Sequence, residues 1–585
     1  MTTSVFTSDD MNDNTSDLLF WGKSIFQIEK SIRASWRKKN LYSFSSDKRK
    51  KCFLIEPPPP TLVKKLYVGH LYNHCPIDII ARYKRMRGYN VFYPVGFDTT
   101  GLPTKDAFEQ WLNIQENKKL GDRNSFDIFL DERSQMYLNV FSDLGLSLNP
   151  KYKYETSSKA MRDFTKNVFE KLFKENSIYF HEGHWFLKVS DINKEVSAFF
   201  QDVKFVPHFK SNQFHNHIRS MNHDWLFSKE RDYGIKIPVK YCSKCKKPHL
   251  LSQSHCCEGA EFNIEKNVFS VWFMAALIPW FLSFVVRGDK NFQLYDIRAN
   301  GAHNICSWDF YTAILGYVTF KKVPWKSIVV SGIVKLTDEE WNDGREESPM
   351  NPPYLIRKYG ADAIRFWCSS ASTGKDVVFS EKKIKEGHHL LYKLLNAGIL
   401  VKKINQKSKN RNISIVHNVF DAWIIDEYNK MLNSFIQYLD EYDFNAALKK
   451  INYFFKIFSG IYLEIVKKRL YEKKQLNNVY FDVFFNLLKC YSPFFPHITD
   501  YIYQNVFKRF YPQKSSIHLF EIEYMKTTNK NNDNSFVEEL LLKLEKMKRT
   551  HSNTLELDNK YADIANKVLD DIKMLSAVEQ LLFVQ

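Results

Sequence analysis

A glycine and a histidine, Gly69 and His70, stand where a predicted helix begins, directly after a proline-rich turn. A glycine lets a ligand approach the backbone closely, and the free N–H groups of a helix N-terminus favour anionic groups such as phosphates. On its own the pair is a weak sign, since an ordinary helix start could look the same. Its place after a buried strand makes nucleotide binding the first chemistry to consider.

Four of the nine cysteines cluster in one segment, where they could hold a metal ion. Cys242 and Cys245 form a CxxC pair, and Cys256 and Cys257 follow a short distance along the chain. Zinc takes four sulfur or nitrogen ligands in a tetrahedron, so Cys256 or His255 would have to complete the set. The other interpretation is a loop of reduced, metal-free cysteines. In either case this cysteine usage is typical of a reducing compartment and not of a disulfide framework.

Two predicted strands position the Gly-His pair. The first covers Phe53 to Ile55, and the second covers Asn90 to Tyr93 and leads to Gly96 and Asp98. Strand, helix and strand in this order make a parallel βαβ unit, as in the first crossover of a nucleotide-binding domain. Pro76 lies inside the helix, where a proline removes one hydrogen bond and kinks the turn.

The charge balance indicates a polyanionic partner. The 585 residues include 84 Lys and Arg against 66 Asp and Glu, a net charge of +18. Nucleic acid is the leading candidate, and the alternative is a basic protein from a Lys-rich proteome. The N-terminus has no apolar signal region and no run reaches ~18 apolar residues, so we expect neither secretion nor a membrane span. The length predicts two to four domains.

The stretch from Phe53 to Lys105 resembles the start of the catalytic domain of class I aminoacyl-tRNA synthetases, most closely the archaeal-type valyl enzymes. The resemblance rests on PPPT, on Gly-His as the end of the family's His-x-Gly-His signature, on RYKRMRGYNVFYP and on G-x-D-x-x-GLPT. Three later stretches also match the family, and they run from Asp224 to Pro238, from Pro353 to Trp367 and from Ser492 to Thr499. As a set these motifs are highly specific, and they cover about residues 17 to 520.

The resemblance implies a parallel α/β, Rossmann-like catalytic domain followed by an α-helical bundle that binds the anticodon stem of tRNA. We expect seven parts: an N-terminal tail and leading helix (1–40), the first half of the catalytic domain (41–187), a remnant of a connective insertion with a candidate zinc knuckle (188–262), the second half with a degenerate signature loop (263–370), a connector (371–416), the helical anticodon-binding-like domain (417–521) and a C-terminal linker with helices (522–585).

The family's editing module is expected to be absent. In the family this module follows the strand that corresponds to His184 to Leu187, and it hydrolyses misloaded threonine. Such a module is needed because an apolar valine pocket cannot reject an isostere that carries a hydroxyl. Here the chain passes almost directly to a segment that resembles the one after the module.

The same resemblance assigns the candidate site residues. The catalytic positions are Tyr67, Gly69, His70 and Arg345; the substrate-binding positions are Pro58, Gly96, Asp98, Gly101, Trp272 and Gly301; and the zinc ligands are Cys242, Cys245, Cys256 and Cys257. Asp98 is the residue that would bind the α-ammonium group of the amino acid.

Several cationic or polar positions of the family signature have changed. Tyr67 replaces the first histidine of His-x-Gly-His, and a phenol cannot carry the charge of an imidazolium. The mobile Lys-Met-Ser-Lys-Ser loop falls on residues 341–345 by an ungapped count, where only Arg345 is cationic and carboxylates stand nearby. The stretch from Gly301 to Trp308 also lacks the His, Glu and Arg of the family. Near residues 341–345, repulsion between these carboxylates and the triphosphate therefore replaces the attraction that the lysines of the family signature would supply.

We therefore expect a valyl-tRNA synthetase-like protein that has lost most or all ATP-dependent valine activation. It would still bind tRNA or a tRNA-like RNA and could bind valine, as a cytoplasmic protein for which a monomer is favoured. ATP and zinc are the candidate cofactors. One alternative is an active minimal valine–tRNA ligase without editing, or a paralogue that activates an amino acid for a non-translational pathway. Another is a scaffold that no longer binds RNA.

Overall fold

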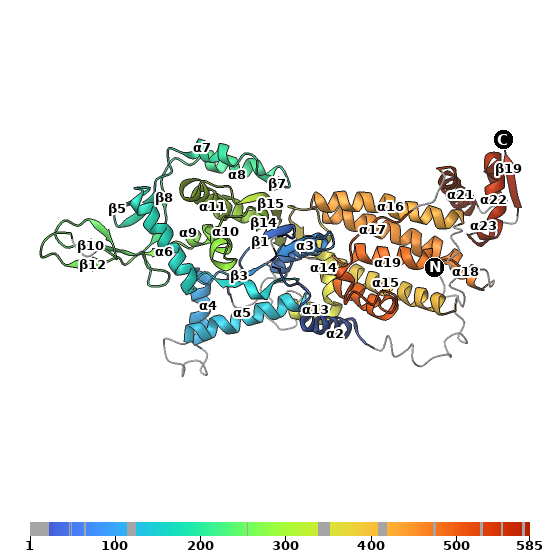
Figure 1. Ribbon diagram of the computed structural model, residues 1–585, viewed down its shortest axis with the longest axis horizontal. Helices are drawn as coiled ribbons and strands as arrows, with labels where there is room; N and C mark the ends of the chain where they lie inside the picture. Colours follow the sequence, from blue (N-terminus) through green and yellow to red (C-terminus); the bar gives the residue numbers. More distant parts are fainter. Residues whose placement is uncertain are drawn as a thin grey trace.

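The computed structural model describes residues 23–584 except 46, 48, 64–65, 114–124, 254–255, 337–350, 408–417, 472–475, 527–530, 551–553 and 576–579. Figure 1 shows an elongated molecule with an α/β part on the left and a helical part on the right. The predicted loop at 341–345, with Arg345, lies outside the described residues, and so does His255.

A five-stranded parallel sheet forms the centre of the α/β part. Its order is β2 (Asn90–Phe92), β1 (Cys52–Glu56), β14 (Tyr295–Gly301), β15 (Trp325–Ser331) and β7 (Lys204–Val206). The central strands read as nearly continuous apolar runs because helices cover both faces of a parallel sheet. Ile55, Ile297 and Ile328 are fully buried in it.

Helix α3 (Val68–Arg85) connects β1 to β2, so the predicted βαβ unit is confirmed. The helix continues through Pro76 to Arg85, and the proline does not end it. The side chains of Leu71, Cys75 and Ile79 are fully buried, which holds one face of α3 against the core.

The smaller sheets belong to the same α/β part. β3 (Val95–Phe97) pairs in parallel with β4 (Lys153–Glu155), and β5 (Ile178–His181), β6 (His184–Leu187) and β8 (Trp225–Leu226) form an antiparallel sheet. β10 (Val239–Cys242), β11 (Pro248–Leu250) and β12 (Phe262–Ile264) form another and project at the far left of Figure 1.

The segment expected to be an insertion remnant, 188–262, is only partly separate from the catalytic sheet. α7 (Asn193–Phe199), β7 and α8 (Lys210–Arg219) lie within it, and β7 pairs with β15 at the sheet edge. A three-residue strand has too short a pattern to be read from sequence, which explains why this edge strand was not predicted.

The second part is the expected helical bundle. It consists of α15 (Glu381–Lys407), α16 (Val419–Asp440), α17 (Phe444–Ile457), α18 (Leu463–Tyr471), α19 (Val479–Tyr491) and α20 (Pro496–Ile502). Aromatic side chains fill its interior, as in the stacked pair Phe458 and Phe484, whose ring centroids are 5.8 Å apart. Beyond it, α21 (Asn531–Thr550) precedes a parallel pair, β18 (Thr554–Asp558) and β19 (Gln580–Val584), that the sequence did not predict.

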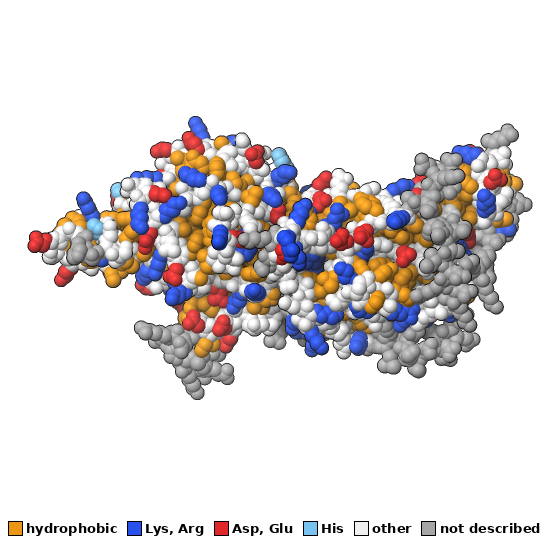
Figure 2. Space-filling view, in the orientation of Figure 1, with side chains coloured by type: hydrophobic (Ala, Val, Ile, Leu, Met, Phe, Trp, Pro, Cys, Tyr) orange, Lys and Arg blue, Asp and Glu red, His pale blue; other side chains and the backbone are white. Residues whose placement is uncertain are grey.

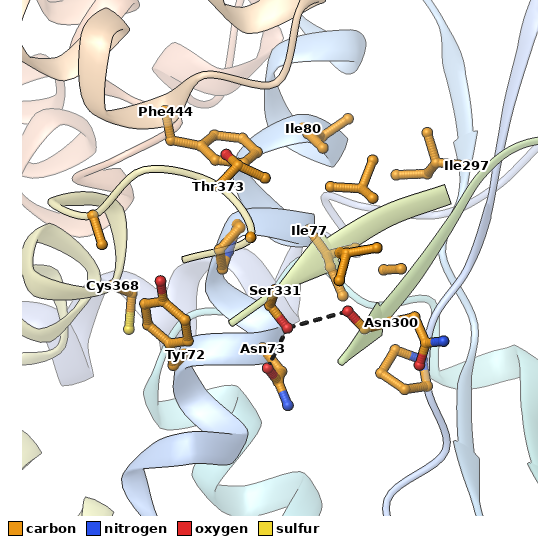
Figure 3. Close-up of a pocket in the computed structure, with 17 residues that line it drawn as sticks. Tyr72, Asn73, Ile77, Ile80, Ile297, Asn300, Ser331, Cys368, Thr373 and Phe444 are labelled. Carbon is orange, nitrogen blue, oxygen red and sulfur yellow. Dashed lines mark hydrogen bonds between the residues drawn. The ribbon is translucent and has the colours of Figure 1, made fainter. Parts of the chain in front are cut away.

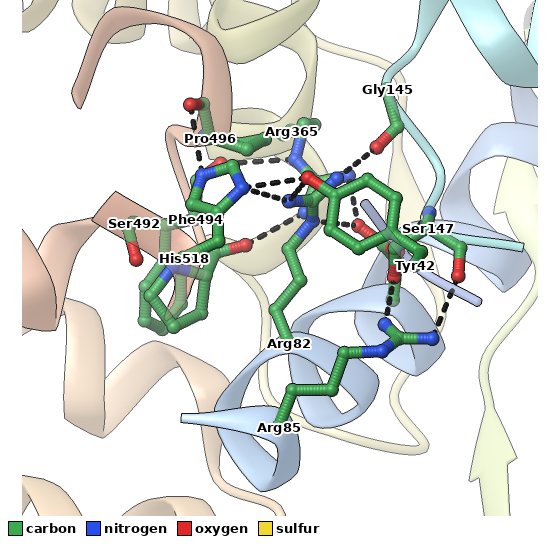
Figure 4. A network of polar contacts seen from close by, with 12 residues as sticks. Tyr42, Arg82, Arg85, Gly145, Ser147, Arg365, Ser492, Phe494, Pro496 and His518 are labelled. Carbon is green, nitrogen blue, oxygen red and sulfur yellow. Dashed lines mark hydrogen bonds and ion pairs between the residues drawn. The ribbon is translucent and has the colours of Figure 1, made fainter. Parts of the chain in front are cut away.

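A buried network of charges, shown in Figure 4, fastens α3 to the helical part. Asp78 accepts hydrogen bonds from Nε of Arg82 at 2.7 Å and contacts NH1 of Arg365, in α14 (Ala361–Ser369), also at 2.7 Å. Arg365 then donates to the backbone carbonyls of Pro493 and Phe494, at 2.7 and 3.0 Å. One carboxylate thus joins a helix of the sheet domain to the loop before α20.

The leading helix α2 (Ile25–Lys38) packs on the same junction. Both oxygens of Glu29 accept the free backbone N–H groups of Ala361 and Asp362 at the start of α14, at 2.8 and 3.0 Å. Nε1 of Trp36 donates to Asp500 in α20 at 2.6 Å. No helix among the described residues combines the length and the apolar character that a membrane crossing requires.

Candidate functional site

A cavity of about 450 Å³ opens at the carboxyl ends of the central strands, where parallel α/β sheets bind ligands. The prolines after β1, the first turn of α3, the end of β14 and α9 (Val271–Ala276) line it. Seven sequence-predicted residues reach it together: Pro58, Tyr67, His70, Asp98, Gly101, Trp272 and Gly301. Two more, Gly69 and Gly96, are covered by the side chains of Tyr67 and Tyr154.

Asp98 follows β3 and presents a carboxylate to this cavity. Its Oδ1 accepts hydrogen bonds from the backbone N–H and the hydroxyl of Thr100 and from the hydroxyl of Thr156, each at 3.2 Å. Burial raises the pKa of Asp98 above its usual value, and these hydrogen bonds partly offset the rise. A fixed carboxylate in a cavity wall is suited to an ammonium group.

The ring of Tyr67 fills the space beside Gly69. A Cβ added at Gly69 would collide with that ring, so the backbone at the first turn of α3 is covered and not open to a ligand. The ring of His70 stands edge-on to Tyr67, with centroids 4.6 Å apart. Burial lowers the pKa of His70 to about 4, so its imidazole is neutral at neutral pH.

The opposite wall comes from the short helical turns that follow β14. The imidazole of His303 lies beside Gly301, in the space that a Cβ there would need, and burial lowers the pKa of His303. Asn304 and Trp308 also line the cavity. Neither residue was singled out from sequence, because the short 3-10 and π-helical turns that carry them have no periodic pattern long enough to predict.

The lining carries few charges. Among the described lining residues, Arg231 is the one lysine or arginine and Asp98 the one acid. The histidines add no positive charge at neutral pH, because burial also lowers the pKa of His74 to about 3. The described part of the cavity can therefore hold one ammonium and one anionic group, but it holds no cluster of cations for a triphosphate.

A buried ion triad supports the floor of the cavity. Arg298 in β14 lies beside Glu56 in β1, with NH2 to Oε1 at 3.2 Å, and its NH1 is 3.4 Å from Oδ1 of Asp309. The guanidinium stands 3.6 Å from the ring centroid of Trp308 and 4.4 Å from that of Trp325. Burial raises the pKa of Glu56 to about 7 and that of Asp309 to about 6.

A second, much smaller cavity of about 30 Å³ lies between α3, β14 and β15 (Figure 3). The Ser331 hydroxyl donates to the side chain of Asn73 and to the carbonyl of Asn300, which ties α3 to both strand ends. Its other walls are largely apolar, with Ile77 and Ile297 among them. This volume has room for about one water molecule, so the cavity is a packing feature.

The four cysteines of the predicted metal site come together at the end of β10. The sulfur atoms of Cys242, Cys245, Cys256 and Cys257 all lie within 4.8 Å of one another. The Cys245–Cys256 and Cys256–Cys257 sulfur distances are 3.3 and 3.8 Å. A zinc tetrahedron with Zn–S bonds of about 2.3 Å has sulfur atoms about 3.8 Å apart, so this set fits the ion.

Comparisons with known families match nearly the whole chain. Residues 31–184 and 178–380 match the family described as tRNA synthetases class I (I, L, M and V), and residues 421–565 match the anticodon-binding domain of tRNA ligase. The first match is in two pieces that meet at 178–184, where the sequence predicts the missing module.

Among individual proteins, the valine–tRNA ligase of Picrophilus torridus is 22% identical, over 85% of this chain and 90% of its own. That of Methanocaldococcus jannaschii is 21% identical, over 95% and 88%. Among solved structures, LeuRS of Agrobacterium radiobacter K84, in a ternary complex with tRNA and LeuAMS, has a TM-score of 0.68 at 13% identity and covers 86% of this chain and 90% of its own. At such identity the structural likeness concerns the fold.

Proposed function

This chain belongs to the class I tRNA synthetases, and we propose that within this family it is a valyl-tRNA synthetase-like protein that binds tRNA and an amino acid but has lost most or all amino-acid activation. The expected fold, a class I catalytic domain followed by a helical anticodon-binding domain, is confirmed. The nine cysteines are unpaired where they are described, which is typical of the reducing cytoplasm where we place this protein.

The observation that carries the proposal is the state of the nucleotide side of the cavity. Activation joins a carboxylate to the α-phosphate of ATP, and its rate depends on cations placed where charge develops. Here Tyr67 covers Gly69, His70 is neutral, and Arg231 is the one described cation of the lining. Removal of one such contact typically reduces the rate by 10²–10³, about 3 kcal/mol.

Binding of tRNA is supported by the anticodon-binding match over residues 421–565 and by the net charge of +18. Figure 2 shows Lys and Arg side chains across both parts of the visible face, including the region where the two parts meet. Contacts from such side chains to phosphates provide most of the affinity for RNA and make it depend on salt.

Three observations support loss of the editing module. The family match breaks at 178–184. The alignment to the P. torridus enzyme spans 702 positions but includes 85% of the 585 residues here, so about 200 aligned positions have no residue in this chain. The described residues from β6 to β8 form α7, β7 and α8, and they leave no room for a separate domain.

A zinc ion held by Cys242, Cys245, Cys256 and Cys257 is also part of the proposal. The sulfur spacing fits a closed tetrahedral site, in which zinc acts as a structural crosslink between strands and takes no part in the reaction. Such an ion would fix the turn between β10 and β11 against the chain before β12.

A second candidate function is an active ligase, either a minimal valine–tRNA ligase or a paralogue that serves a non-translational pathway. Arg231 and Asp98 favour it, since they line one cavity and could hold a phosphate and an ammonium group. Arg345 could add a further cation from the loop by a one-residue slip, although a guanidinium is a poor copy of a lysine point charge.

Amino-acid-dependent pyrophosphate exchange separates the two functions. We expect the unmodified chain to give exchange near background with valine, and a valine tRNA to shift in a gel with an affinity that falls steeply with salt. The double variant Trp341→Lys with Gly344→Lys returns two ammonium groups to the loop and should raise exchange. Robust exchange by the unmodified chain would establish the active ligase. If the chain shows no salt-dependent binding of tRNA, the remaining alternative is a scaffold that no longer binds RNA.

A further inference from the structure

One wall of the main cavity carries an amide as well as the ring of Trp308. Asn304 is half-buried and lines the cavity. Its backbone carbonyl accepts a hydrogen bond from the hydroxyl of Ser307 at 3.4 Å, but its side chain has no hydrogen-bond partner among the residues that the structure describes. The amide is open to the cavity, so a ligand that covers it must either bond to it or leave it unpaired.

The surroundings of this amide define a small compartment. Asn304 ends a 3-10 turn and Trp308 lies in the π-helical turn that follows it, and both line the cavity. Nε1 of Trp308 donates to the carbonyl of Ala275 in α9 at 2.8 Å, which fixes the ring against the helix that carries Trp272. On its other side, Trp308 contacts the guanidinium of Arg298 at 3.6 Å. The compartment therefore has two indole walls, of which that of Trp308 is held by a hydrogen bond, and one amide.

We propose that the side chain taken by this compartment is short and β-branched and carries a hydroxyl, so that the preferred amino acid is threonine and not valine. This inference rests on the proposed function, in which the cavity binds an amino acid and Asp98 holds its ammonium group. Threonine and valine have the same shape, and they differ in one hydroxyl against one methyl group. The methyl group of threonine contacts the indole rings, and its hydroxyl exchanges hydrogen bonds with the Asn304 amide.

The direction of selectivity follows from the amide. An apolar pocket discriminates poorly against an added hydroxyl, whereas a pocket with a polar group aimed at the hydroxyl rejects the analogue that lacks it, because that group is then left unpaired. Valine would leave the amide of Asn304 unpaired. A cavity of this kind does not need to remove misbound threonine, which agrees with the proposed loss of the editing module.

Isothermal titration calorimetry of the full-length chain with threonine, valine and alanine tests the inference. We expect threonine to bind at least roughly tenfold more tightly than valine, the factor expected when one partly buried polar group is left unpaired. Asn304→Leu keeps the branched shape of the side chain without its polar atoms, so it should remove the preference or reverse it. Asn263→Leu, at an exposed position in β12, is the matched control and should leave the preference unchanged.

Equal or tighter binding of valine by the unmodified chain would overturn the inference, and so would a threonine preference that Asn304→Leu leaves intact. Asp98→Asn serves as the second variant and should abolish binding of all three amino acids. The tRNA gel shift on the same preparation reports on the proposed function separately. If tRNA binds and no amino acid does, this inference fails while tRNA binding stands. If tRNA also fails to bind, the proposed function fails as well.

Discussion

Tyr67 shows how one side chain can change the use of a strand–turn–helix geometry. The strand, the turn and the helix start that place Gly69 are all present, and the N–H of His70 donates to the carbonyl of Tyr67. The Tyr67 ring lies over that glycine, in the space that a side chain there would need. The positions of Gly69 and His70 were predictable from sequence, but the covering of the glycine depends on a side-chain rotamer and was not.

Replacement of Tyr67 by alanine should therefore open this surface. We expect Tyr67→Ala to bind ATP about tenfold more tightly than the unmodified chain, since uncovered helix N–H groups attract phosphate. Pyrophosphate exchange should stay near background, because no cation is added. Displacement of a fluorescent ATP analogue measures the affinity, and Tyr453→Ala, at an exposed site in the bundle, is the control. An unchanged ATP affinity in Tyr67→Ala would contradict the role given to the ring.

At the scale of the elements, β1 and β14 are held together by a buried ion triad as well as by the sheet. Arg298 was not recognised from sequence as a core residue, because an arginine in a strand is ordinarily predicted to face solvent. It is fully buried between two indole rings and faces Glu56 and Asp309. Pairing between neighbouring strands that lie far apart in sequence created this environment, and local patterns do not contain that information.

Removal of the arginine should destabilise the sheet in a pH-dependent way. Arg298→Met leaves Glu56 and Asp309 buried without a cation, and the loss of one partner of a buried pair typically reduces the free energy of unfolding by about 3–5 kcal/mol. Glu56 and Asp309 have raised pKa values in the folded state, so each destabilises the fold as the pH rises and its carboxyl group ionises. The reduction in the free energy of unfolding should therefore be larger at pH 8 than at pH 5.5. Urea unfolding at both values measures it, with Arg49→Met as the exposed control. A deficit that is equal at both pH values would show that the carboxylates do not carry the effect.

The cysteine cluster at β10 can be tested as an element of its own. We expect the chain purified under reducing conditions to contain about one zinc ion, and Cys256→Ser to contain much less, because zinc needs all four thiolates in a closed site. Elemental analysis gives the zinc content. Limited proteolysis should cut within residues 239–264 faster after removal of the ion by a chelator. Cys52→Ser changes a cysteine outside the cluster and should keep the metal. A zinc-free chain that cannot be loaded would contradict the site.

The elements themselves were predictable to different degrees. The βαβ unit and the helical bundle follow from long periodic patterns and specific motifs, and both are present. The short edge strand β7 and the parallel pair β18 and β19 were not predicted, because each owes its identity to a partner strand distant in sequence. For the same reason the grouping of Asn304 and Trp308 with Trp272 became apparent only in the folded cavity.

At the scale of the whole molecule, three segments that are far apart in the chain meet in one buried cluster. Glu29 of α2, Asp362 of α14 and His497 of α20 have ligand atoms within 4.8 Å of one another. Nδ1 of His497 lies 2.7 Å from Oδ1 of Asp362, and burial lowers the pKa of His497 to about 4 although Asp362 opposes the shift. The cluster therefore makes the junction of the two parts sensitive to acid.

The contribution of His497 to the stability of the chain should fall as the pH drops from about 6.5 to 4. A histidine with a lowered folded-state pKa contributes stability that is present above its unfolded pKa of about 6.5 and is lost as the pH falls. For His497 the loss amounts to about 3 kcal/mol at most. Urea unfolding across this range measures it, and His497→Asn should show a smaller loss than the unmodified chain. His181→Gln, an exposed histidine, should not. The same slope in His497→Asn and the unmodified chain would exclude His497 as a source.

Helix α3 begins at the ligand cavity with Tyr67 as its N-cap and reaches the Asp78, Arg82 and Arg365 network in its second half. Its 18 residues make a rod of about 27 Å. We therefore expect a ligand that displaces the start of α3 to alter the ion network at its other end, and with it the affinity of the bundle for RNA. Linkage is reciprocal. If a bound amino acid changes the affinity for RNA by some factor, bound RNA changes the affinity for the amino acid by the same factor. A protein that performs no reaction would then still respond to both ligands.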